Sequence, residues 1–129
     1  MTPSTMLPAN EAVLKRRFPD AYIKIMQTGN RMPTSFYYED TTKGPKLKII
    51  HGEYEYSPYG SQDQEKLLER WFSNLNLVPE SLYSLSGFGD GSHVRYFIDN
   101  SGTGVNVMVA EKDPALLRET FARFDFSDL

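Results

Sequence analysis

Residues 87–112 read GFGDGSHVRYFIDNSGTGVNVMVAEK, and this stretch carries the strongest fold signals in the chain. A glycine-rich loop leads into His93–Asp99, where Val94, Tyr96 and Ile98 alternate with their neighbours in the manner of a half-buried strand. A second glycine-containing segment then precedes Val105–Ala110, whose valines share one face of a second strand. The pattern predicts an antiparallel hairpin over residues 93–110.

The preceding part of the chain predicts one helix and a strand meander. Asn10 is a candidate N-cap for a helix over Glu11–Arg17, which Pro19 ends. Alternating side chains then predict strands over Ala21–Gln27 and Lys46–Tyr56, and Ser35–Asp40 between them is expected to be a further strand. Gly52 interrupts the last of these strands and is expected to mark a bulge.

Three further helices are expected. Ser61 has the spacing of a capping box, and the residues after it repeat apolar side chains at helical intervals, namely Leu67, Leu68, Trp71, Phe72 and Leu75. Pro79 is placed to begin a short helix over Glu80–Leu85. Asp113 and Pro114 have the positions of N-cap and first-turn residue for a last helix over Ala115–Phe124.

These elements predict an α+β fold with a single antiparallel sheet of about five strands, a meander plus a hairpin, packed by two or three helices. We expect one domain over residues 1–129, which is an ordinary domain length, with residues 1–9 and 125–129 as tails.

The amino-acid composition excludes several classes of function. The chain has no cysteine, which excludes disulfides, thiolate metal sites and cysteine nucleophiles. No apolar run approaches the ~20 residues of a membrane span, and Met1–Asn10 lacks the regions of a signal peptide. We therefore expect a cytoplasmic protein without a membrane partner.

Charge argues against a nucleic-acid partner. The net charge is −3, with a balance of +2 in residues 1–60 and −5 in the remainder. Binding to phosphates usually requires a basic surplus. Single-stranded nucleic acid is kept as a third hypothesis, because Tyr37, Tyr54, Lys46 and Lys48 combine aromatic and basic side chains.

No cofactor or metal is expected. The two glycine loops have Ser92 and Val107 where a dinucleotide-binding fingerprint requires its third glycine, and neither is predicted to connect a strand to a helix. The only histidines, His51 and His93, have no cysteines to complete a zinc site.

An enzymatic hypothesis rests on His93 and Arg95. On the predicted strand these two side chains share a face beside the Gly87–Gly91 loop, where an acid–base group and an anion binder could cooperate. The alternative function is thus a small enzyme or ligand-binding domain.

The favoured hypothesis is binding to another macromolecule, most simply a protein. Tyr37, Tyr54, Tyr56 and Tyr59 lie on neighbouring predicted strands or just after them, and tyrosine is enriched at protein interfaces. An inhibitor, an immunity protein, a virus-encoded antagonist or an accessory subunit would fit the size and acidity of the chain. The pattern leaves the oligomeric state open.

Overall fold

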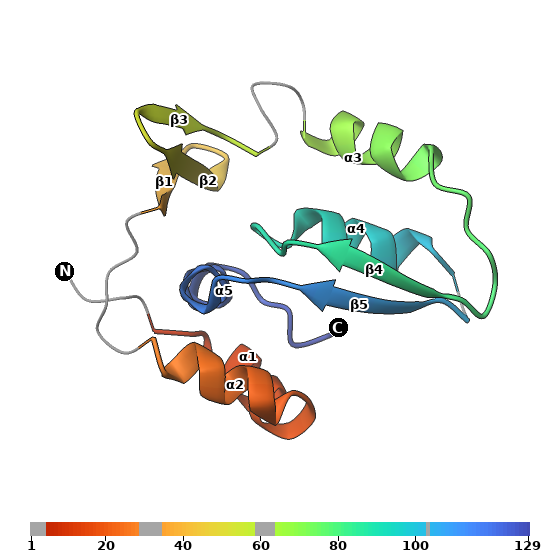
Figure 1. Ribbon diagram of the computed structural model, residues 1–129, viewed down its shortest axis with the longest axis horizontal. Helices are drawn as coiled ribbons and strands as arrows, with labels where there is room; N and C mark the ends of the chain where they lie inside the picture. The colour runs from red at the N-terminus through yellow and green to blue at the C-terminus, as the bar shows by residue number, and fades with distance from the viewer. Residues whose placement is uncertain (1–4, 29–34, 59–63, 103) are drawn as a thin grey trace.

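The computed structural model describes residues 5–28, 35–58, 64–102 and 104–129, and these form an α+β fold (Figure 1). Its helices are α1 (Pro8–Arg17), α2 (Pro19–Met26), α3 (Gln64–Ser73), α4 (Ser92–Asn100) and α5 (Pro114–Arg123). Its strands are β1 (Phe36–Thr41), β2 (Gly44–His51), β3 (Tyr54–Tyr56), β4 (Leu82–Ser86) and β5 (Asn106–Ala110). None of these helices is long and apolar enough to cross a membrane.

The strands form two sheets, so the prediction of a single five-stranded antiparallel sheet is wrong. β1, β2 and β3 form an antiparallel meander, whereas β4 and β5 form a separate parallel pair. Within the meander Phe36 lies opposite Ile49, and Ile49 lies opposite Tyr56. Gly52, with φ of 63°, lies in the turn between β2 and β3 and not in a bulge of one long strand.

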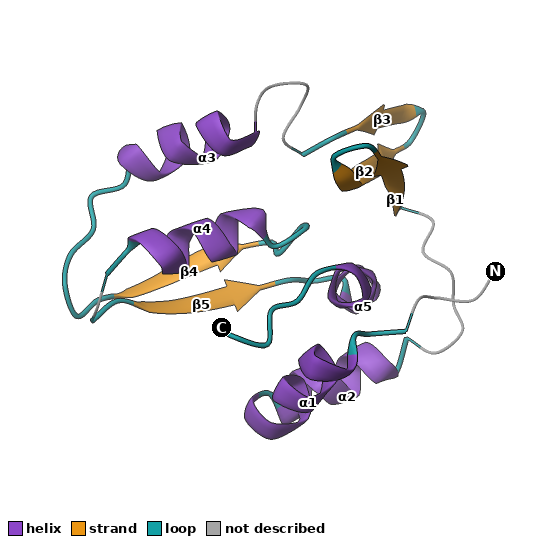
Figure 2. Ribbon diagram, turned by 180° about the vertical axis from the view of Figure 1, so that it is seen from behind, coloured by secondary structure: helices purple, strands orange, loops and turns teal. Residues whose placement is uncertain are grey.

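The predicted hairpin over residues 93–110 is also wrong, because its first half is helix α4. This helix connects β4 to β5 and lies over one face of the pair (Figure 2). Its buried side chains, Val94 and Phe97, are three residues apart, which is the helical and not the strand period. The helix predicted over residues 80–85 is wrong, because residues 82–86 form strand β4. Glu80, two residues before this strand, has a left-handed φ of 62°.

The strand predicted over residues 21–27 is helix α2. Pro19 ends α1 as expected, but it also occupies the first turn of α2, where its fixed φ suits a helix. Ile25 is buried, whereas Ile23 and Met26 are exposed. The apparent alternation of Ile23 and Ile25 is therefore a coincidence within a helical pattern.

Helix α5 is the centre of the core. Its N-terminal residues Ala115 and Leu116 pack with Phe36 and Leu47 of the meander. Phe121, further along, belongs to a second cluster that reaches the other helices, with Met6, Leu14, Ile25, Phe88 and Val94. The predicted cap of α5 is confirmed, since the Asp113 side chain accepts a hydrogen bond from the Ala115 amide.

Buried Asn10 fastens helix α1 to the end of the chain. Its amide nitrogen donates to the carbonyls of Phe121 and Phe124 at 2.9 and 2.7 Å, and its Oδ1 accepts from the Phe126 amide at 2.7 Å. The predicted N-cap role is wrong, because α1 begins at Pro8 and Asn10 lies inside it. The α1–α2 pair is thus held against α5 and the segment after it.

Candidate functional site

The structure divides the predicted tyrosine site between two faces of the meander. Tyr54 and Tyr56 pair with His51 and Ile49, so they lie on the face that carries Phe36. They are 77% and 52% exposed. Tyr37 lies on the opposite face, and Tyr59 falls outside the described residues.

The face of Tyr37 carries charges of both signs. The Tyr37 hydroxyl donates to Glu55, and this bond raises the pKa of the phenol. Lys48 forms an ion pair with Glu39 at 3.6 Å. Tyr37, Lys46 and Lys48 share this face but Tyr54 does not, so the four residues of the nucleic-acid hypothesis do not form one surface.

His93 and Arg95 point to different sides of α4, so the prediction that they share a face is wrong. Residues two apart on a helix are separated by about 200°. The His93 ring nitrogen Nε2 lies 2.9 Å from the Gly87 carbonyl oxygen, and its ring meets Trp71 edge-on at 6.1 Å between centroids. This histidine joins α3, α4 and the glycine loop.

Arg95 instead binds the C-terminal segment. Its guanidinium donates to both carboxylate oxygens of Asp128 at 3.0 and 2.9 Å and to the Asp125 carbonyl at 2.8 Å. The hydrogen bond from Arg95 holds the pKa of Asp128 below its ordinary value. Arg95 therefore has a structural partner on the side of the helix away from His93.

The Gly87–Gly91 loop does connect a strand to a helix, contrary to expectation. It leaves β4 and enters α4, and Gly91 at the helix start has φ of 80°. Asp90 of this loop accepts a hydrogen bond from the Ser92 amide at 2.9 Å. The chain thus supplies its own anion at the N-terminus of α4.

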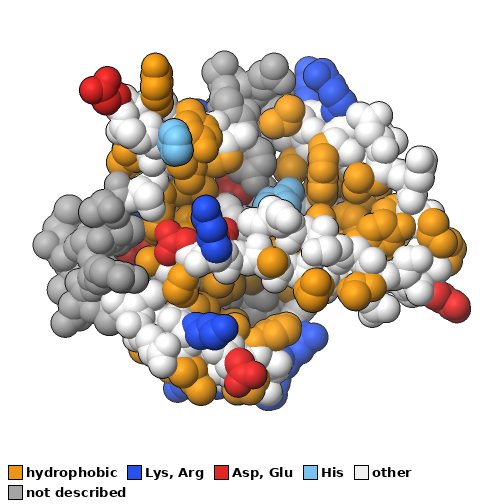
Figure 3. Space-filling model, viewed as in Figure 1, with side chains coloured by type: hydrophobic (Ala, Val, Ile, Leu, Met, Phe, Trp, Pro, Cys, Tyr) orange, Lys and Arg blue, Asp and Glu red, His pale blue; other side chains and the backbone are white. Residues whose placement is uncertain are grey.

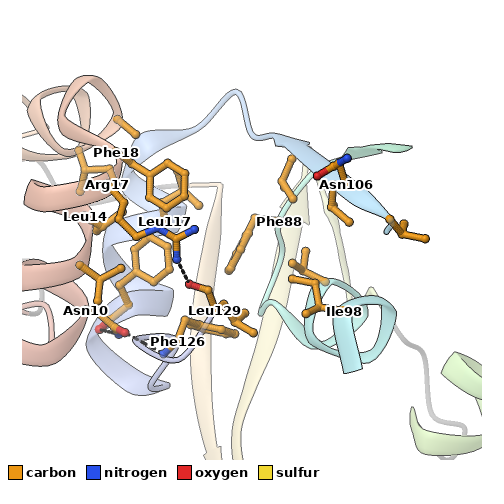
Figure 4. A pocket seen from close by; sticks show the side chains of 18 residues that line it. Asn10, Leu14, Arg17, Phe18, Phe88, Ile98, Asn106, Leu117, Phe126 and Leu129 are labelled. Atoms are coloured by element: carbon orange, nitrogen blue, oxygen red, sulfur yellow. Dashed lines mark hydrogen bonds between the residues drawn. The ribbon is translucent and has the colours of Figure 1, made fainter. Parts of the chain in front are cut away.

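A groove that the sequence did not suggest lies between the α1–α2 pair and β5. One part is a cavity of about 410 Å³, lined on one side by both helices and on the other by α4 and β5 (Figure 4). A second hollow of about 990 Å³ continues past the end of β5 towards Lys112. In Figure 3 the surface is hollowed between the helices at the bottom of the view and the strands above them.

The groove has an apolar floor and apolar rims. Leu117, Phe121, Phe88 and Phe126 lie between its two walls, and Phe88, Phe121 and Phe126 contact one another at 5.3–5.8 Å between ring centroids. Phe18 on the helix side is 49% exposed, and Ile98 on the α4 side is 38% exposed. Such an arrangement can bury apolar side chains of a ligand.

The outer edge of β5 opens onto this groove. The Asn106 amide donates to the Ser81 carbonyl, and the Ala110 carbonyl accepts from the Gly87 amide. In a parallel ladder this places the backbone groups of residues 106, 108 and 110 towards β4. The N–H and C=O groups of Val107 and Val109 therefore point outward, and no hydrogen bond in the described part of the chain satisfies them.

Glu111 and Lys112 line the groove just past the end of β5, and its other charged side chains lie on the helix wall. Arg17 and Lys24 line it there, together with Asp20. One Arg17 nitrogen, Nη1, donates to the main-chain oxygen of Leu129 at 2.6 Å, as Figure 4 shows. The opposite wall has no charged residue in β4 or β5. A ligand in the groove thus meets an uncharged strand edge, charges of both signs just past the end of that strand, and a helix wall that carries two cations and one anion.

Within the described ranges, no group of three or more histidines and carboxylates is placed to hold a metal ion. No family model matches the chain, and neither a curated protein nor a solved structure is significantly similar to it. The candidate site therefore rests on geometry alone.

Sequence reasoning missed the groove because its walls come from distant parts of the chain. One usable signal existed in LYSLS, residues 82–86, which alternates apolar and polar side chains as a strand does. Reading it as a strand would have made residues 92–100 the connection of a parallel pair. The open edge of β5 would then have followed.

Proposed function

We propose that the protein acts by binding a segment of another protein in the groove between α1–α2 and β5, without chemistry of its own. The observation that carries this proposal is the unpaired backbone edge of β5, which borders an apolar, elongated hollow. A protein segment offers both main-chain hydrogen-bonding groups and apolar side chains, and so matches both features.

The surroundings of His93 and Arg95, the pair of the alternative enzymatic hypothesis, favour a binding role. Arg95 is held by Asp128, and His93 contacts the Gly87 carbonyl and Trp71, so each is engaged in contacts within the fold. The exposed Tyr54 and Tyr56 remain a second candidate surface for the same class of partner.

Mutations can distinguish the groove from the Tyr54–Tyr56 surface as the binding site. The partner is first purified from the native cell by means of the tagged protein. Ile98→Lys introduces a charge at the apolar rim of the groove, and we expect it to weaken partner binding at least about tenfold. Leu82→Lys is the matched control, because Leu82 is an exposed apolar residue on the helix-free face of β4. Isothermal titration calorimetry measures each affinity.

Tyr54→Ala combined with Tyr56→Ala completes the comparison. We expect this variant to bind the partner with unchanged affinity. Loss of binding in the tyrosine variant, with wild-type affinity in Ile98→Lys, would move the site to the meander and contradict the proposal for the groove.

A further inference from the structure

We propose that the bound segment adds to the β4–β5 sheet as a third strand, paired with the outer edge of β5. This inference rests on the proposed function and specifies how the partner is recognised. Its occupant is an extended segment of another protein, with apolar side chains at alternate positions and an acidic residue near the helix wall.

The first argument is the incompleteness of the sheet. Parallel sheets are ordinarily covered on both faces and contain more than two strands. Here α4 lies over one face, while Leu82 and Met108 on the other are 66% and 53% exposed. A strand beside β5 would satisfy the outward N–H and C=O groups of Val107 and Val109.

The second argument is that the edge of β5 carries no feature that prevents pairing. Natural edge strands are usually protected by lysine, proline, bulges or inward charges. The strand reads NVMVA, residues 106–110, with none of these. What borders the edge is the groove, in which an extended chain can lie.

The third argument concerns the side chains of the added strand. Successive side chains of a strand point to opposite faces. Val107 and Val109 line the groove, so every second residue of the added strand would point into the same apolar space, towards Phe88 and Leu117. The remaining residues would lie on the helix-free face beside Met108.

Charge supplies the last part of the specificity. Lys24 lies on the wall of the groove and forms no ion pair within the described part of the chain. Asp20, Glu111 and Lys112 line the same hollow, and Glu111 already accepts hydrogen bonds from the Phe88 and Asp113 amides. An acidic residue of the partner segment would complement Lys24. Two folded copies of this chain fit the edge less well, because α1–α2 lies across the groove from β5 in each copy.

The test uses dodecapeptides selected from a random phage-displayed library on the full chain. Each selected peptide is resynthesised with an N-methyl group at one position at a time, and its affinity for the wild-type protein is measured. Strand addition predicts losses of about tenfold at alternate positions within the short stretch that pairs with the edge of β5, and little loss elsewhere, because only alternate amides of that stretch face Val107 and Val109.

A pair of protein variants tests the hydrogen bonds between the peptide and β5 by changing the protein and not the peptide. Val107→Pro removes the outward N–H and leaves the β4–β5 ladder intact, because the Val107 amide is not part of that ladder. Val107→Ala keeps the N–H and is the matched control. We expect about tenfold weaker peptide binding for the proline variant and less than about threefold for the alanine variant.

The failure of the inference and that of the proposed function are distinguishable. Peptides that lose affinity with Ile98→Lys but tolerate N-methylation at every position would confirm the groove and overturn strand addition. Peptides indifferent to Ile98→Lys, or no selected peptide at all, would contradict the proposed function itself. A homodimer in solution that Val107→Pro dissociates would assign the edge to a second copy and overturn the inference.

Discussion

At the scale of single residues, Gly91 is the position where sequence and packing are most tightly coupled. Its φ of 80° lies in the left-handed region, and a Cβ there would come within 2.8 Å of a Phe88 ring carbon and would also overlap the Phe126 ring. A glycine at this site lets α4 begin directly against the aromatic floor of the groove.

Gly91→Ala should therefore destabilise the protein by about 2–4 kcal/mol, combining backbone strain with overpacking. Gly102→Ala is the matched control, because Gly102 has a similar φ of 77° but open space around it. We expect the control to cost only about 1 kcal/mol. Urea denaturation followed by Trp71 fluorescence measures both, and equal losses would contradict the packing described around Gly91.

At the scale of the elements, local signals predicted those parts that depend on neighbouring residues alone. Asp113 and Pro114 begin α5 as expected, since capping involves a few adjacent groups. The helical period of residues 64–73 is equally local.

Residues 93–99 could not be assigned from local pattern, because Val94 fits either period. Their state is decided by β4 and β5, which pair in parallel and so need a crossover connection. The groove depends still more on distant contacts, since Leu14 and Val107 reach opposite walls only after the chain has folded. The spacing of residues along the sequence does not predict which distant residues will face each other across the groove.

The Arg95–Asp128 pair joins α4 to the C-terminal segment, and it should make stability depend on pH. The pKa of Asp128 lies below its ordinary value of 3.8 in the folded state, mainly because Arg95 donates a hydrogen bond to it. The unfolded state therefore takes up a proton first as the pH falls. The contribution of this pair is present above about pH 4 and is lost during further acidification.

Urea denaturation at about pH 7 and about pH 3 checks this prediction. Arg95→Gln should reduce the difference in the free energy of unfolding between the two conditions. Arg70→Gln is the control, because the Arg70 side chain forms no ion pair within the described ranges. An unchanged difference in Arg95→Gln would contradict the assigned role of the pair.

At the scale of the whole molecule, the fold is two sheets held by one central helix. Helix α5 packs on the meander through Ala115 and Leu116, and its Phe121 reaches the cluster beneath the groove. The α1–α2 pair is fastened to α5 and the segment after it, partly through Asn10. This attachment lies at the floor of the groove and does not involve β5. The groove and the outer edge of β5 therefore remain open.

Amide hydrogen exchange, measured residue by residue by NMR, tests the open edge most directly. In the free protein the amides of Asn106, Met108 and Ala110 should be protected by β4, whereas those of Val107 and Val109 should exchange rapidly. Addition of a groove-binding peptide should protect Val107 and Val109. Protection of these two amides in the free protein, or rapid exchange in the complex, would contradict the account.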